Sequence, residues 1–193
     1  GDAAELDGTS ILVQGSIVTL HVFYAIDFMH VNGSQRQAVT QLTVSESVVS
    51  VRTTASSKLL CIAAGAWLQR SSILVFSSQI TVAPQSVAIG YPAIALAVYP
   101  YTVSSASRTV DSFTWDLTNS DVYLTTGSSN SGTWFLLGHQ SPNVSLTAIT
   151  THIYRSNFTV MVGAASLWKF ASSRLNGMII NATDFNLKIS CQY

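Results

Sequence analysis

The residues that could act as metal ligands, acids or bases are widely spaced along this chain. Its four histidines are His21, His30, His139 and His152, and no two of them have the close spacing of a metal site. No Gly-x-Ser-x-Gly elbow and no glycine-rich phosphate loop is present. We therefore expect no enzyme, no metal and no cofactor, although a triad assembled from distant residues leaves no local mark in a sequence.

Three carboxylates recur at a constant spacing: Asp111, Asp116 and Asp121. On a strand, residues five positions apart point to opposite faces. We therefore expect no paired-carboxylate site from these acids and interpret them as polar residues of loops and strand edges.

Binding is the alternative to catalysis, and a β-sheet scaffold carries binding on its loops. The segments His30–Gln37 and Thr125–Thr133 are polar and contain turn-forming residues, so we expect them to form contact loops. Trp67 lies close to Gly65, which also indicates a position near a loop, with core packing as the alternative role. The residues that we expect to contact a receptor are Asn32, Gln35, Arg36, Trp67, Ser128 and Asn130.

Sequons and cysteines indicate two covalent modifications. Asn-x-Ser/Thr sequons begin at Asn32, Asn143, Asn157 and Asn181, whereas chance alone predicts about two in a chain so rich in Ser and Thr. Asn157 lies in a strand-like run, where a glycan requires an outward-facing side chain. Cys61 and Cys191 also lie in strand-like runs and are candidates for one disulfide, with two buried free thiols as the alternative.

The composition limits the classes of partner. Charged residues make up 9% of the 193 residues, against roughly 25% in an average soluble domain. The formal net charge is zero and no basic run is present, so we expect no nucleic-acid partner. A surface covered by Ser and Thr is typical of proteins that work outside cells or inside an assembly. The apolar stretch Ser86–Val103 is interrupted by Gly and Pro and is shorter than the about 20 residues of a membrane span, so we expect no membrane insertion.

Alternation of apolar and polar residues predicts strands along most of the chain. It is clearest in Ile17–Phe28 and Phe185–Cys191. Ser86–Val103 is typical of one or two buried strands between proline turns. Asn32-Gly33 and Asn176-Gly177 favour type I′ turns, so we expect antiparallel hairpins at both places. A helix at Lys58–Ala64 is an alternative to a strand there.

The spacing of these strands predicts the fold class. Strand candidates recur about every 12 to 18 residues without amphipathic helices between them, and we find no internal repeat. We therefore expect an all-β chain with little helix, an antiparallel β-sandwich or jelly-roll-like head of about 8–10 strands. Residues 1–9 are expected to be a lead-in or stalk end, and residues 10–193 a single domain.

The stretch from Ser57-Lys58-Leu59-Leu60-Cys61-Ile62 to Ile73-Leu74-Val75-Phe76 is similar to the paired early strands of adenovirus-type fibre heads, although more residues precede it here. The charge-poor, Ser/Thr-rich composition likewise resembles viral attachment proteins, including reovirus-like spikes. The resemblance implies a homotrimeric, non-catalytic head on the virion surface that binds a host cell-surface protein or glycan. The alternatives are a structural capsid or coat protruding domain and a secreted, extracellular carbohydrate-binding adhesion domain.

Overall fold

The structure is a computed structural model, and it describes residues 5–8, 10–22, 29–30, 36–38, 41–53, 61–64, 67–84, 95–98, 108–125, 133–139, 144–162, 164–170 and 174–191. These residues form twenty β-strands. No helix occurs among them, so none has the length and apolar character needed to cross a membrane. The expectation of an all-β chain is confirmed for the described residues.

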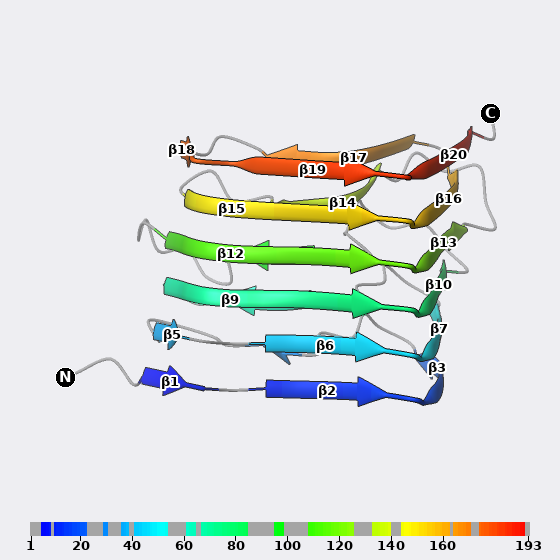
Figure 1. The fold of residues 1–193 in the computed structure, drawn as a ribbon, viewed down its shortest axis with the longest axis horizontal. Coiled ribbons are helices and arrows are strands. Elements are labelled where there is room, and N and C mark those ends of the chain that lie inside the picture. Colours follow the sequence, from blue (N-terminus) through cyan, green and yellow to red (C-terminus); the bar gives the residue numbers. More distant parts are fainter. Residues whose placement is uncertain are drawn as a thin grey trace.

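The strands stack as the successive coils of a parallel β-helix (Figure 1). A first long sheet contains β2 (Ser10–Gln14), β6 (Gln41–Ser45), β9 (Trp67–Phe76), β12 (Arg108–Thr118), β15 (Val144–Tyr154) and β19 (Ile179–Thr183). A second long sheet contains β3 (Ile17–Val22), β7 (Val48–Thr53), β10 (Gln79–Pro84), β13 (Asp121–Thr125), β16 (Asn157–Val162) and β20 (Asn186–Cys191). Each coil gives one strand to each sheet, so the described chain makes six coils.

Shorter strands complete the coils. The first sheet continues around a bend through β1 (Glu5–Asp7), β5 (Arg36–Ala38) and β18 (Arg174–Asn176). A further sheet contains β4 (Met29–His30), β8 (Cys61–Ala64) and β11 (Ala95–Val98), and β11 lies beside the parallel pair of β14 (Thr133–His139) and β17 (Ala164–Phe170). The expected lead-in therefore contains a strand, because β1 pairs with β5.

The core lies between the two long sheets, where equivalent residues of successive coils stack on one another. In the first sheet, Val44, Val75 and Leu117 occupy one register column and are fully buried. In the second sheet, Ile80 and Phe158 belong to another such column. Burial of a side chain of this size contributes about 1.5–3 kcal/mol, so these columns supply a large part of the free energy that holds the coils together.

The strand direction corrects the predicted topology. Every strand pair of the described residues is parallel, so the antiparallel β-sandwich or jelly roll is wrong. The expectation of no internal repeat is also wrong, because equivalent residues recur in every coil. Alternation indicates which face of a strand a residue lies on, but it does not give the direction of the next strand.

The predicted hairpin at Asn176-Gly177 is wrong for a related reason. Gly177 has a φ of +70°, as an Asn-Gly turn requires, but it joins β18 to β19, and both strands pair in parallel with β15. The positive φ therefore bends one coil instead of reversing the chain. Arg70, Ser112 and Ala148 have positive φ at the equivalent bends of earlier coils. Asn32-Gly33 lies outside the described residues, but the strands on either side of it, β4 and β5, do not pair with each other.

Candidate functional site

The turn between the two long sheets is built in the same way in each coil, and we call it the corner. Its first residue is exposed and has positive φ; we call these residues the ridge, and they are Gly15, Glu46, Ser77, Asn119, Arg155 and Asp184. The residue after each ridge position is serine in five coils, namely Ser16, Ser47, Ser78, Ser120 and Ser156, and is Phe185 in the last. A small polar residue suits this place, because the backbone turns sharply next to the core and its polar groups need partners.

Hydrogen bonds between neighbouring corners join the serines into a column. The Ser78 hydroxyl donates to the Phe76 carbonyl at 2.7 Å and accepts the Ser47 N–H at 3.1 Å. The Ser78 N–H in turn donates to the Ser120 hydroxyl at 3.1 Å. Ser47, Ser78 and Ser120 are buried, so their hydroxyls serve the scaffold and are not available to a ligand.

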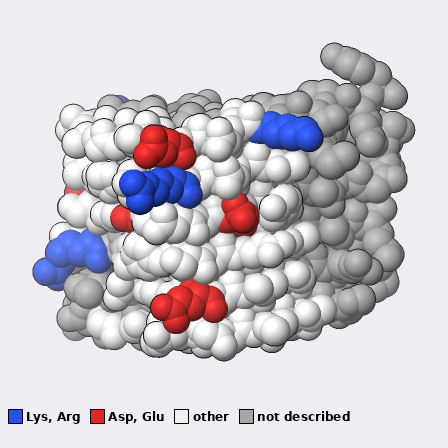
Figure 2. All heavy atoms as spheres, turned by 45° about the vertical axis from the view of Figure 1, so that its right-hand side comes forward, with Lys and Arg blue, Asp and Glu red and all other residues white. Residues whose placement is uncertain are grey.

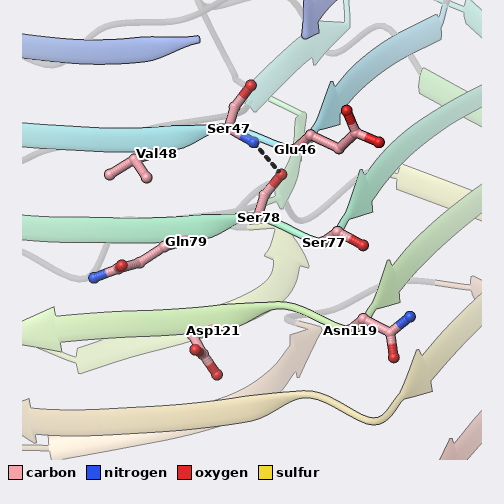
Figure 3. A pocket seen from close by; sticks show the side chains of 8 residues that line it. All are labelled: Glu46, Ser47, Val48, Ser77, Ser78, Gln79, Asn119 and Asp121. Atoms are coloured by element: carbon pink, nitrogen blue, oxygen red, sulfur yellow. Dashed lines mark hydrogen bonds between the residues drawn. The ribbon is translucent and has the colours of Figure 1, made fainter. Parts of the chain in front are cut away.

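An open groove of about 440 Å³ lies along the corner of the second, third and fourth coils (Figure 3). Its lining residues are Glu46, Ser47, Val48, Ser77, Ser78, Gln79, Asn119 and Asp121. Figure 3 shows the ridge side chains of Glu46, Ser77 and Asn119 along one side and those of Val48, Gln79 and Asp121 along the other. The groups that this corner groove offers are therefore two amides, a hydroxyl, two carboxylates and one apolar side chain.

A chain of side-chain hydrogen bonds continues from the groove towards the last coil. The Asn157 amide donates through Nδ2 to Asp121 Oδ1 at 2.7 Å. Asn186 Nδ2 donates to Asn157 Oδ1 at 2.9 Å. These residues occupy one register column on the outer face of the second sheet. The bonds hold the Asp121 carboxylate in place at the edge of the groove.

Charged groups are few on this side of the molecule, as Figure 2 shows. Arg155 Nε lies 3.8 Å from Asp184 Oδ2, and both side chains are largely exposed. The Arg155 guanidinium also lies 4.9 Å from the centre of the Tyr154 ring. Within the described ranges, no group of three or more His, Cys, Asp or Glu is placed to hold a metal ion. The described surface thus offers hydrogen bonds in place of concentrated charge.

The structure corrects the expectation that acidic residues five positions apart on a strand point to opposite faces. Asp111 and Asp116 are both half-buried on the outer side of β12, although they are five residues apart. The positive φ of Ser112 shifts the alternation by one residue, so the strict strand rule fails here. Asp116 and His152 occupy neighbouring register positions, whereas Asp121 lies beyond the corner on the second sheet.

Only part of the predicted receptor site falls on described residues. Arg36 and Trp67 are the first residues of β5 and β9 and are paired in register, so the structure brings these two positions together. Neither lies at the corner groove. Outside the described residues lie Asn32, Gln35, Ser128, Asn130 and the sequon residue Asn143.

The candidate modification sites are placed as follows. Asn157 and Asn181 are exposed on the outer faces of β16 and β19, but both polar ends of the Asn157 amide are hydrogen-bonded. Cys61 begins β8 in the second coil, and Cys191 ends β20 in the sixth. Four steps from coil to coil, each of about 4.8 Å, separate these two coils. The Cα atoms of a disulfide are at most about 7 Å apart. This arrangement gives no support to a bridge within one chain.

The corner groove has a signal in the sequence, but an irregular repeat obscures it. The short strings Gln-Gly-Ser-Ile, Ser-Glu-Ser-Val, Phe-Ser-Ser-Gln, Thr-Asn-Ser-Asp and Tyr-Arg-Ser-Asn mark its corners. Their serines are 31, 31, 42 and 36 residues apart. The unequal spacing hides the repeat, although the pattern of a ridge residue and a serine between two alternating strands could have revealed it.

Comparison of the chain with protein-family models, with curated proteins and with solved structures finds no match.

Proposed function

We propose that this chain is a non-catalytic attachment module that binds a host cell-surface glycan at the corner groove. In this proposal it belongs to a protein on the surface of a virus particle, as its charge-poor, Ser/Thr-rich composition suggests. The observation that carries the proposal is the groove itself, in which mainly uncharged hydrogen-bonding side chains follow one another from coil to coil.

The chemistry of the groove favours a sugar over a charged ligand. The amides of Gln79 and Asn119 each offer both donors and acceptors, and the Glu46 carboxylate adds an acceptor. Sugar hydroxyls need such mixed partners. Equivalent residues of neighbouring coils are about 4.8 Å apart, so the groove presents similar groups at regular intervals to an extended chain of sugars.

The other expected partners remain predictions. A protein receptor is the alternative ligand, and it would use the positions of Arg36 and Trp67 in addition to the groove. The resemblance to viral heads implies a homotrimer with contacts between the sides of the coils, and this closed assembly is the alternative to the head-to-tail association inferred below. A secreted adhesion domain would use the same groove, and a capsid or coat protruding domain would use its surface for contacts between subunits.

Glycan binding to variants of the groove tests the proposal. The double variant Gln79→Ala/Asn119→Ala removes exposed amides and should weaken binding to a glycan identified on an array by at least about tenfold, since each lost hydrogen bond costs about 1 kcal/mol. Asn181→Ala is the matched control, because this exposed amide lies on the outer face of β19, away from the groove. Equal loss in the control, or no glycan bound by the unaltered chain, would contradict the proposal.

A further inference from the structure

We propose that a second copy of this chain stacks head to tail on the first, so that the last coil of one copy pairs with the first coil of the next. The two ends of the β-helix carry complementary halves of the junction that already joins coil to coil within the chain. Three features of the ends support this contact: the corner hydrogen bonds, the apolar residues at both ends and one pair of charges.

The junction between coils is defined by three recurring hydrogen bonds at the corner. Between the third and fourth coils, the Ser77 N–H donates to the Thr118 carbonyl at 3.0 Å. The Asp121 N–H donates to the Ser78 carbonyl at 2.9 Å, and the Ser78 N–H donates to the Ser120 hydroxyl at 3.1 Å. The same three bonds occur at each of the first four junctions, and the fifth keeps the two carbonyl bonds.

The open end of the last coil presents one half of this junction. Asp184 occupies the ridge position, whose N–H in earlier coils donates to the following coil. Phe185 occupies the serine position, whose N–H and carbonyl in earlier coils also bind the following coil. In the sixth coil these three backbone groups face the end of the stack.

The open end of the first coil presents the other half. The carbonyl of Gln14 is equivalent to that of Ser45, which accepts the ridge N–H of the preceding coil. The N–H of Ile17 is equivalent to that of Val48, which donates to the preceding coil. The hydroxyl of Ser16 donates to the Gln14 carbonyl at 2.7 Å and is placed to accept a further N–H. A copy stacked in register would therefore restore all three bonds.

Apolar residues at inward positions are exposed at the ends of the stack. Ile180 and Leu187 lie in columns that are buried in the middle coils, yet they are 42% and 38% exposed. At the other end, Ile11 and Val18 occupy the same two columns and are only half-buried. Head-to-tail stacking places Ile180 against Ile11 and Leu187 against Val18, which removes apolar surface from water.

Charge complementarity fixes the direction of the contact. The register column that begins with Glu5 in the first coil ends with Arg174 in the last. An in-register copy brings Arg174 next to Glu5, an opposite-charge pair. A contact between two first coils or between two last coils would contain only one member of this pair. The head-to-tail contact leaves both outer ends free, so it does not close and extends into a filament.

Sedimentation velocity over a range of concentrations tests this inference on the 193-residue chain. We expect masses that rise with concentration from 20.7 kDa through the dimer without stopping at a fixed number of copies. Ile17→Pro removes the N–H that faces the open end, and should raise the dissociation constant by at least about tenfold. Ile17→Ala is the matched control, because it keeps this N–H and alters only a side chain that is 84% exposed.

A charge reversal provides an independent variant that does not alter the backbone. Arg174→Glu should weaken association by about two- to fivefold, and adding Glu5→Arg should restore it. A constant mass of one copy would overturn the proposal, as would a closed dimer or trimer. Equal association of the Ile17→Pro and Ile17→Ala variants would overturn it as well.

Discussion

The buried serines of the corner column are single residues that stabilise the junctions between coils. Each buried serine satisfies a backbone N–H of the neighbouring coil and donates to a carbonyl of its own coil. A buried N–H without a partner costs about 1–3 kcal/mol. The hydroxyl at this position therefore has a structural role that could not be assigned from the many other serines of the sequence.

Replacement of one serine tests this role. Ser78→Ala leaves the Ser47 N–H without its acceptor and should lower the free energy of unfolding by about 1–3 kcal/mol. Ser72→Ala is the control, because Ser72 is half-buried on the outer face of β9 and should change stability by less than about 0.5 kcal/mol. Equilibrium unfolding in urea measures both; equal effects would contradict the proposed role of the column.

Two neighbouring core residues carry unsatisfied polar atoms. Trp115 and Thr151 are paired in register and fully buried, and Trp115 Nε1 and Thr151 Oγ1 have no hydrogen-bond partner. A buried hydroxyl without a partner destabilises the folded state, because folding removes its bonds to water. The sequence does not indicate these unsatisfied polar atoms, because the two side chains are buried only when the coils are stacked.

Removal of the unsatisfied hydroxyl should therefore stabilise the protein. Thr151→Val keeps the shape of the side chain and should raise the free energy of unfolding by about 1 kcal/mol. Thr150→Val, on the outer face of the same strand, should have little effect. Thermal unfolding of both variants tests this, and a destabilised Thr151→Val protein would show that the hydroxyl has a partner in solution.

At the scale of the strands, the bends decide where each element ends. The ridge positions have φ values between 47° and 55°, a region that costs a residue with a side chain about 1–2 kcal/mol. The sequence places Gly15 and Asn119 at two of them, but Glu46, Ser77 and Arg155 at others. Since the last three are not typical turn residues at positive φ, these bends were not predictable from local propensity.

Glycine should relieve the strain at a bend and weaken a strand. Ser77→Gly is expected to raise the free energy of unfolding by about 0.5–1 kcal/mol, because Ser77 has a φ of 47°. Ser45→Gly, at the end of β6, is expected to lower it by about 0.5–1 kcal/mol. Chemical denaturation should give these opposite signs, and destabilisation by both changes would argue against a strained ridge.

At the scale of the whole molecule, the sequence indicated the class but not the architecture. Alternation indicates β3 and β20 as strands and shows which of their residues share a face. The same alternation fits an antiparallel sandwich and a parallel β-helix equally well, because a strand pattern contains no information about its partner. The candidate groove is difficult to derive from the sequence, since it combines corner residues from three coils and the corners recur at unequal spacing.

The β-helix also explains how a chain with so few charges presents an ordered polar surface. Its outer columns repeat polar groups from coil to coil, and the head-to-tail contact inferred above involves only the first and last described coils. The groove and the ends are separate surfaces, so glycan binding and head-to-tail stacking are independently testable.

Parallel, in-register stacking is the central claim, and a designed cross-link tests it most directly. Thr114 and Thr150 face outwards and are register partners on β12 and β15. In a chain without its native cysteines, Thr114→Cys/Thr150→Cys should form a disulfide at low protein concentration, since paired strands are about 4.8 Å apart. Thr114→Cys/Thr147→Cys is the control, because its second site is three residues out of register, about 10 Å along the strand.

We expect mass spectrometry of digested protein to find the cross-link in the in-register variant and not in the control. Cross-linking of the control as readily as the in-register variant, or failure of the in-register pair to form, would contradict the parallel β-helix.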